Sequence, residues 1–201
     1  MSTTNETHPL IPARLILASA SPYKIGLLTR MGLRFTAQDA AIDETRRPDE
    51  APEALARRLA REKAQAVAAG HPDAFVIGAD QVIALEDRIF SKPGTFEVAT
   101  EHLQALQGRT HLLMNAVALA TPDGLHEALV TYEMTMRPLT EREIGAYLLI
   151  DEPFDCAGAY RFESSGILLF QDASGPDPTA IEGLPLTRVY ALLREGGYFR
   201  G

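Results

Sequence analysis

One cysteine, Cys156, and no tryptophan occur among the 201 residues of the sequence. A single cysteine excludes an intramolecular disulfide and provides no CxxC or Cys/His spacing for a metal site. The five histidines are scattered without HExxH spacing, and no GxSxG motif occurs. These absences argue against a Cys/His metal centre and a covalent nucleophile, and they fit a reducing compartment.

Long apolar runs are also missing. No window stays apolar for the roughly 18 residues that a membrane span needs. Residues 1–12 read MSTTNETHPLIP and lack the basic segment and apolar run of a secretory signal. We therefore expect a flexible tail over 1–13, no membrane partner and a cytoplasmic location.

Positive charge is scarce, because 19 Lys and Arg residues face 27 Asp and Glu residues, for a net charge of −8. Nucleic-acid backbones are held by clustered Lys and Arg, so we do not expect a nucleic-acid partner. A small anion can still bind where a few cations converge.

The sequence has helix and strand signals in alternation. Ser21 and Pro22 predict the start of one helix, and Asp49 is predicted to cap a second that has Pro52 in its first turn. The apolar run 75–79 predicts an interior strand that breaks off at Asp80. Further elements are expected as a hairpin at 81–90, strands at 111–120, 128–139 and 166–170, and helices at 95–106, 140–152 and 184–197.

Hairpins exclude a purely parallel sheet. Since 46% of the residues are hydrophobic, the chain can bury a substantial core. We predict an α/β fold with a mixed sheet, as a single domain over 14–201 that has two lobes.

The stretch LILASASPYK, residues 15–24, is a candidate anion site. A strand leads into a helix whose first turn exposes unpaired N–H groups, while Ser19 and Ser21 add hydroxyls and Lys24 adds a charge. The same pattern is also a common way to begin a helix without any ligand.

Lys63 is a second candidate, because helical geometry places it in the arc between Leu55 and Val67 that ought to be buried. It would be a cation at the rim of a cleft, or a lysine whose amine snorkels to solvent. Lys92, in a loop, is a third cation, with a solvated side chain as the ordinary alternative.

Carboxylates come from Glu44 and Asp80. Asp80 ends an apolar run, so its side chain is expected to emerge at a strand end, where α/β sheets bind ligands. Carboxylates there can bind Mg²⁺ and orient or deprotonate a water, although acids in turns are commoner. Together with the lysines they indicate a metal-assisted site for a polyphosphate.

Eight segments, in order and over 14–198, resemble the Maf (septum-formation inhibitor-like) nucleotide pyrophosphatases: LILASASPYKIGLL, AIDETRRPDE, REKA, VIGADQV, SKPGT, LQGRTH, DCAGAYRFESSGI and IEGLPL. The resemblance implies an elongated α/β fold with a mixed sheet and a central cleft, similar to inosine-triphosphate pyrophosphatases. It also implies hydrolysis of a nucleoside triphosphate to the monophosphate and pyrophosphate with a divalent metal, Mg²⁺, Mn²⁺ or Co²⁺, often in a homodimer.

The same resemblance assigns roles to particular residues. Asp80 matches the proton acceptor, and Glu44 with Asp80 matches the acids on the metal side. The phosphate-binding hydroxyl and cations correspond to Ser19, Lys24, Lys63 and Lys92.

Three positions separate the subgroups of the family. Tyr23, Gln81 and Glu163 all resemble the 7-methyl-GTP subgroup, whereas the dTTP/UTP subgroup has SPRR, GADTV and GIQG. N7-methylation makes the purine cationic, which suits an aromatic face and a carboxylate. Ser164 departs from this pattern, since the subgroup usually has glycine there, and Tyr160 resembles the other subgroup.

We therefore expect an enzyme that cleanses the nucleotide pool of 7-methyl-GTP or a related nucleotide. A dTTP/UTP pyrophosphatase is the alternative within the family. A nucleotide-binding regulator of cell division with little turnover is the alternative of another class.

Overall fold

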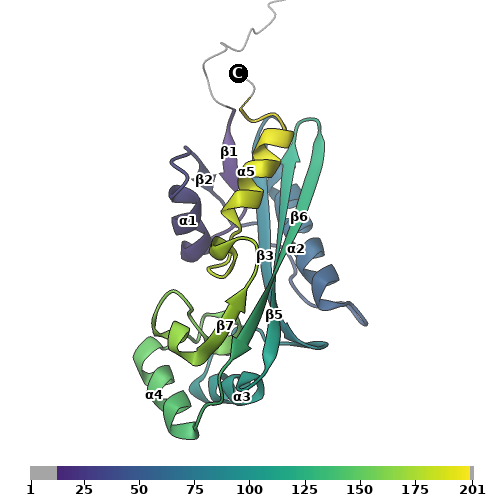
Figure 1. Cartoon of the computed structure of the whole chain (residues 1–201). Coiled ribbons are helices and arrows are strands. Elements are labelled where there is room, and N and C mark those ends of the chain that lie inside the picture. Colours follow the sequence, from purple (N-terminus) through teal and green to yellow (C-terminus); the bar gives the residue numbers. More distant parts are fainter. Residues whose placement is uncertain (1–12, 200–201) are drawn as a thin grey trace, which may run out of the picture.

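The computed structural model describes residues 13–199 (Figure 1). Apart from Ala13, the predicted tail over 1–13 lies outside the described residues. A seven-stranded sheet has the order β2-β1-β3-β5-β6-β7, and β4 pairs with β3. Its strands are β1 (Leu15–Leu17), β2 (Thr36–Ala37), β3 (Phe75–Leu85), β4 (Arg88–Ile89), β5 (Thr110–Thr121), β6 (Gly124–Met136) and β7 (Phe170–Ser174).

The sheet is mixed, as predicted. Strand β1 pairs in parallel with β2 and β3, and the remaining pairings are antiparallel. The helices are α1 (Pro22–Thr29), α2 (Pro52–Ala68), α3 (Phe96–Leu106), α4 (Glu141–Asp151) and α5 (Leu186–Glu195). Short 3₁₀ turns occupy Ala157–Ala159, Ser165–Leu169 and Pro178–Ala180.

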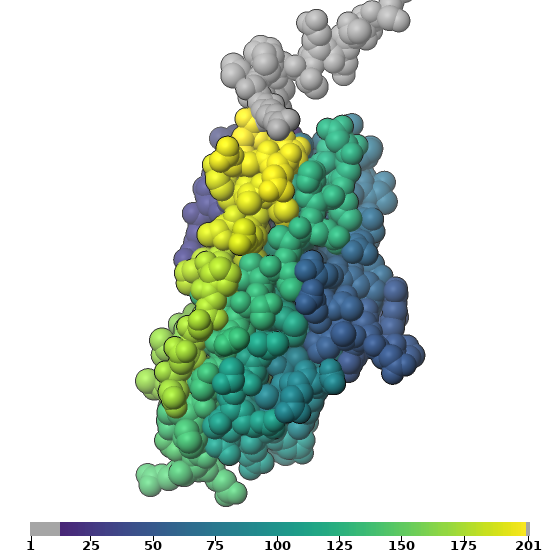
Figure 2. Space-filling view, turned by 45° about the vertical axis from the view of Figure 1, so that its right-hand side comes forward, coloured from purple at the N-terminus to yellow at the C-terminus, as the bar shows by residue number. Residues whose placement is uncertain are grey.

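Long strands β3, β5 and β6 form the spine of an elongated molecule (Figure 1). Helices α1 and α5 lie at one end of this spine, α3 and α4 lie at the other, and α2 packs on β3 and β5. Figure 2 shows α5 in yellow beside the green hairpin of β5 and β6. One sheet therefore runs through both ends of the molecule.

Local signals account for most helix starts. The Ser21 hydroxyl accepts from the Lys24 N–H at the start of α1. At the start of α3 the Thr95 hydroxyl accepts from the Val98 N–H. Thr140 and Glu143 form the capping box of α4. None of the helices in the described part of the chain combines the length and apolar character needed to cross a bilayer.

The predicted cap of α2 is wrong. Ala51 is the N-cap and makes no side-chain cap bond, while Asp49 sits in a left-handed turn with φ of 55°. The turn is organised by Glu50, whose carboxylate accepts from the Arg47 N–H and pairs with Arg58. Asp49 is therefore part of the turn that precedes the helix.

The predicted end of the interior strand at Asp80 is also wrong. Strand β3 continues to Leu85, and Asp80 lies in its middle opposite Ala116 of β5. The strand continues because Val82, Ile83 and Ala84 are buried and paired with β5. Asp80 is thus a buried acid in a central strand, which needs a polar partner.

Residues 166–170 do not form the predicted strand. A 3₁₀ turn covers Ser165–Leu169, and β7 begins only at Phe170. The Gly166 N–H turns inward to the carbonyl of Arg161 and the carboxylate of Asp151, so it cannot join a sheet ladder.

Helix α2 makes its closest approach to the sheet at Gly78. A Cβ at this position would lie 2.1 Å from the carbonyl oxygen of Ala60 and 2.5 Å from the backbone nitrogen of Ala64. Only glycine allows this spacing between helix and strand.

We expect Gly78→Ala to lower the free energy of unfolding by about 2 kcal/mol or more, because the added methyl must push α2 off β3. Urea denaturation measures the change. The matched control is Gly145→Ala in α4, where a Cβ meets nothing within 4 Å. That variant should be neutral or stabilising by up to about 1 kcal/mol, and equal stability of the two variants would contradict the close packing.

Candidate active site

A cleft of about 650 Å³ opens between α1, α2, the middle of β3 and the segments around Asp155, Glu163 and Gly183. The structure brings together around it the candidate site residues predicted from the sequence: Ser19, Ser21, Tyr23, Lys24, Glu44, Lys63, Asp80, Gln81, Lys92 and Glu163.

Lysine is concentrated in this cleft. The chain has only three lysines, and all of them line the cleft, whereas none of the described arginines does. Lys63 forms ion pairs, but Lys24 and Lys92 take part in none within the described residues. Two cations are therefore left for a ligand.

Lys63, Asp80 and Glu44 form the centre of the cleft. The Lys63 Nζ lies 2.6 Å from Asp80 Oδ1 and 2.8 Å from Glu44 Oε1. The Lys63 and Asp80 side chains are only 13% and 11% exposed. Lys63 therefore does not snorkel to solvent, since its amine ends on a buried carboxylate.

The Asp80 carboxyl has a raised pKa. Burial raises its pKa above the ordinary value, and this effect outweighs the opposing charges of Lys63 and Lys24. A raised pKa suits a carboxylate that takes a proton near neutral pH.

The start of α1 forms one wall of the cleft. The Ser19 hydroxyl oxygen accepts from the Ser21 N–H at 3.1 Å, which orients it beside the first turn of the helix. Burial lowers the pKa of Lys24, while the nearby Asp80 charge opposes that shift. Lys92 is exposed on the segment that follows β4.

Tyr23 is fixed at the cleft by the side chains of Asp155 and Cys156. Its hydroxyl donates to Asp155 Oδ2 at 3.2 Å and accepts from the Cys156 thiol at 3.7 Å. The guanidinium carbon of Arg161 lies 5.8 Å from the ring centre. Burial raises the pKa of Tyr23 to about 12, so the hydroxyl stays protonated.

Gln81 and Glu163 face the same space from different segments. The Gln81 amide donates to the carbonyls of Ala180 and Ile181, which ties β3 to the segment that carries Gly183. Partial burial raises the pKa of Glu163. Within the described residues, the Glu163 side chain makes no hydrogen bond or ion pair with another side chain.

Sequence patterns did not identify Asp155, Arg161 or Glu182 as neighbours of the cleft. Asp155 and Glu182 line it, and Arg161 packs beside Tyr23. Their positions depend on loops that return from distant parts of the chain, so no local spacing signals them. The signal that could have found them is the resemblance, because Asp155 and Arg161 lie in its segment DCAGAYRFESSGI and Glu182 lies in IEGLPL.

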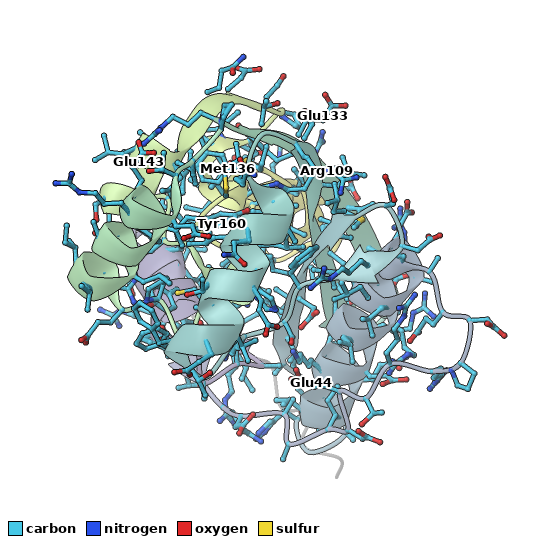
Figure 3. All side chains as sticks on the ribbon, turned by 90° about the horizontal axis from the view of Figure 1, so that it is seen from below. Glu44, Arg109, Glu133, Met136, Glu143 and Tyr160 are labelled. Carbon is cyan, nitrogen blue, oxygen red and sulfur yellow. The ribbon has the colours of Figure 1, made fainter. Side chains whose placement is uncertain are left out.

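The cleft has too little positive charge to hold a polyphosphate by itself. Three lysines face six acids around its wall: Asp39, Glu44, Asp80, Asp155, Glu163 and Glu182. The described residues hold no cluster of three or more His, Cys, Asp or Glu side chains arranged for a metal. The pair Glu44 and Asp80 does fit Mg²⁺, which commonly uses one or two carboxylates together with substrate phosphates and water. Figure 3 labels Glu44 beside α2, where its 59% exposed side chain is open to a ligand.

Comparison with known proteins identifies the family of the chain. The family described as Maf-like protein matches residues 14–196. A 7-methyl-GTP pyrophosphatase of Cupriavidus pinatubonensis is 44% identical, with 92% of this chain and 94% of that protein covered. A 7-methyl-GTP pyrophosphatase of Bordetella pertussis is 46% identical, with 94% and 95% covered.

Among solved structures, the Ham1 protein of Staphylococcus aureus aligns with a TM-score of 0.45 and 15% identity, covering 61% of this chain and 71% of that one. The match to Maf-like protein and the identity to these curated relatives extend over nearly the whole chain. The chain therefore belongs to the Maf family.

Proposed function

We propose that this protein hydrolyses the bond between the α and β phosphates of 7-methyl-GTP or a closely related nucleotide, which removes it from the nucleotide pool. The observation that carries the reaction is that all three lysines and Asp80 line one cleft. The substrate rests on Tyr23, Gln81 and Glu163 and on relatives that carry this name.

The lysines bind the triphosphate in this proposal. A triphosphate carries about four negative charges, which Lys24 and Lys92 partly offset while the Ser19 hydroxyl donates to a phosphate oxygen. Lys63 holds Asp80 in place and faces the same phosphates. Each lysine is a compact charge on a flexible stem, so it can follow the phosphates as the bond breaks.

A divalent cation would be held by Glu44 and Asp80. When bound, such a cation neutralises phosphate oxygens and stabilises the charge that develops on the leaving pyrophosphate. The excess of acids in the cleft makes this contribution necessary, because three lysines alone do not balance both the acids and the substrate.

Asp80 is the general base. A water attacks the α phosphorus, its proton passes to the Asp80 carboxylate, and the bond to the bridging oxygen breaks to release pyrophosphate. Water is the nucleophile, so neither an activated serine nor a thiolate is needed. The raised pKa of Asp80 matches this role.

Tyr23 and Glu163 recognise the cationic base. Arg161 lies over one face of the Tyr23 ring, which leaves the other face for the methylated purine. Glu163 accepts from the N1–H and 2-amino groups and complements the positive charge. Gln81 supports this end of the cleft through its bonds to Ala180 and Ile181.

We further propose that the enzyme works in the cytoplasm as a homodimer, as the resemblance implies. Light scattering of the purified protein measures its mass in solution and so tests the homodimer.

Turnover of 7-methyl-GTP should exceed that of GTP, dTTP and UTP, because only the methylated base is cationic. The assay measures monophosphate and pyrophosphate by chromatography, with and without a chelator, and the chelator should abolish turnover. Faster hydrolysis of dTTP or UTP would contradict the substrate specificity proposed for Tyr23, Gln81 and Glu163. Full activity in the presence of the chelator would contradict the proposed role of a divalent cation.

Asp80→Asn should lose most turnover, by about 10²-fold or more, while it retains nucleotide binding, because the amide cannot accept the proton. In the wild type, kcat/KM should rise with pH through the raised pKa of Asp80, since only the ionised form acts as a base. The matched control is Asp123→Asn, in the turn between β5 and β6, which should have wild-type kinetics. Full activity of Asp80→Asn would overturn the mechanism.

Amine-selective acetylation should modify Lys24 at lower pH than Lys63. Burial lowers the pKa of Lys24, whereas the ion pairs with Asp80 and Glu44 hold the pKa of Lys63 above its ordinary value despite its burial. Peptide mass spectrometry quantifies both sites, and added pyrophosphate should protect them. Earlier modification of Lys63, or no protection, would contradict the proposed phosphate site.

A further inference from the structure

Glu163 lies in a short loop, residues 161–166, that is anchored on one face of α4. The Arg161 N–H donates to the hydroxyl of Tyr147 at 2.9 Å, and the Arg161 guanidinium donates to the carbonyl of Asp151 at 3.3 Å. Tyr147 and Asp151 are one helical turn apart, so they present a common face to the loop.

The Asp151 carboxylate binds the end of the same loop. Its Oδ1 accepts from the hydroxyls of Ser164, at 3.0 Å, and of Ser165, while its Oδ2 accepts from the Gly166 N–H at 3.1 Å. Three consecutive residues directly after Glu163 therefore donate to one carboxylate.

Asp151 is an unexpected residue for its position. It is the last residue of α4, where the helix dipole disfavours a negative charge, and the last turn of α4 has no basic residue. It is only 8% exposed. Burial would raise its pKa, but hydrogen bonds from Ser165, Ser164 and Tyr147 lower it below the ordinary value, so the carboxylate stays ionised.

The loop itself is tightly closed. The carbonyl of Arg161 accepts from the N–H groups of Ser164 and Gly166. A Cβ on Gly166 would lie 2.2 Å from that carbonyl oxygen, so glycine is required there.

The position of Glu163 depends on the bonds that hold the loop 161–166 against α4. It lines the cleft, and within the described residues no other side chain holds it. The position of its carboxylate is therefore set by the backbone on either side, which Tyr147 and Asp151 fix.

We propose that Asp151, together with Tyr147, is a positioning residue for substrate recognition: it holds the loop 161–166 so that Glu163 points at the base. This rests on the proposed function, in which Glu163 contacts the base. It also gives Ser164, which stands where glycine is usual in the subgroup, a function as one of the three donors to Asp151.

The test is a double-mutant cycle between Asp151→Asn and Glu163→Gln, read in steady-state kinetics. Asp151→Asn should raise KM for 7-methyl-GTP by about tenfold, the cost of roughly one hydrogen bond to a charged group, with kcat within about twofold. The preference for 7-methyl-GTP over GTP should fall with it. In the Glu163→Gln background, Asp151→Asn should change neither quantity further.

Two further variants keep the test decisive. Ser165→Ala removes one donor and leaves Asp151 in place, so it serves if Asp151→Asn does not fold, and it should raise KM in the same direction. Glu143→Gln weakens the capping box at the opposite end of α4, on which Figure 3 labels Glu143, and should lower the melting temperature without changing KM.

Loss of thermal stability with unchanged KM and selectivity in Asp151→Asn or Ser165→Ala would overturn the positioning role. The positioning role would also be overturned if Asp151→Asn changed KM and selectivity equally in the wild type and in the Glu163→Gln background. If the wild type prefers dTTP or UTP, the proposed substrate fails, and the same cycle on KM for that nucleotide still decides whether Asp151 acts through Glu163.

Discussion

The ion pair between Lys63 and Asp80 is the interaction on which the cleft depends. Asp80 lies in the middle of a central strand, where a carboxylate loses hydration and needs a partner. Helix α2 can supply one because Gly78, two residues earlier in β3, allows the backbone of Ala60 and Ala64 to approach the strand. The same close approach brings the Lys63 amine to 2.6 Å from Asp80.

Such a pair contributes little to stability, because the cost of dehydrating two charges offsets their attraction. A well-packed apolar pair would serve the fold equally well. Its value is therefore chemical: burial raises the pKa of Asp80, while Lys63 keeps the carboxylate oriented toward the open side of the cleft where Glu44 also lies. The packing of α2 on β3 and the pKa of Asp80 are thus set by one arrangement.

The sequence predicted which residues share the cleft better than it predicted the strands around them. Caps such as Ser21 and Thr140 act over three or four residues, so local patterns suffice for them. Asp80 was expected at a strand end because a charge interrupts the apolar run, but nine register pairs with β5 carry the strand past it. The same long-range effect explains Gly166, where a bond to Asp151 on α4 replaces the expected ladder bond.

The resemblance predicted the residues that line the cleft. It assigned no role to the residues that hold those side chains in position. Asp155, Arg161 and Asp151 act through contacts that span between 10 and 132 residues of chain. Whether a carboxylate is a surface charge or an anchor depends on which loop folds back on it. That information exists only in the assembled structure.

The distribution of cations follows the same logic. Arginines make every ion pair in the described residues other than those of Lys63, for example Arg58 with Glu50 and Arg61 with Glu127. A planar guanidinium matches a carboxylate in two parallel bonds, so arginine is well suited to hold the protein together. Lysine, with a compact charge and a pKa that responds to burial, is confined to the cleft. An acidic chain can therefore bind an anionic substrate, because Lys24 and Lys92, which form no ion pair with any described carboxylate, line the same cleft as Asp80.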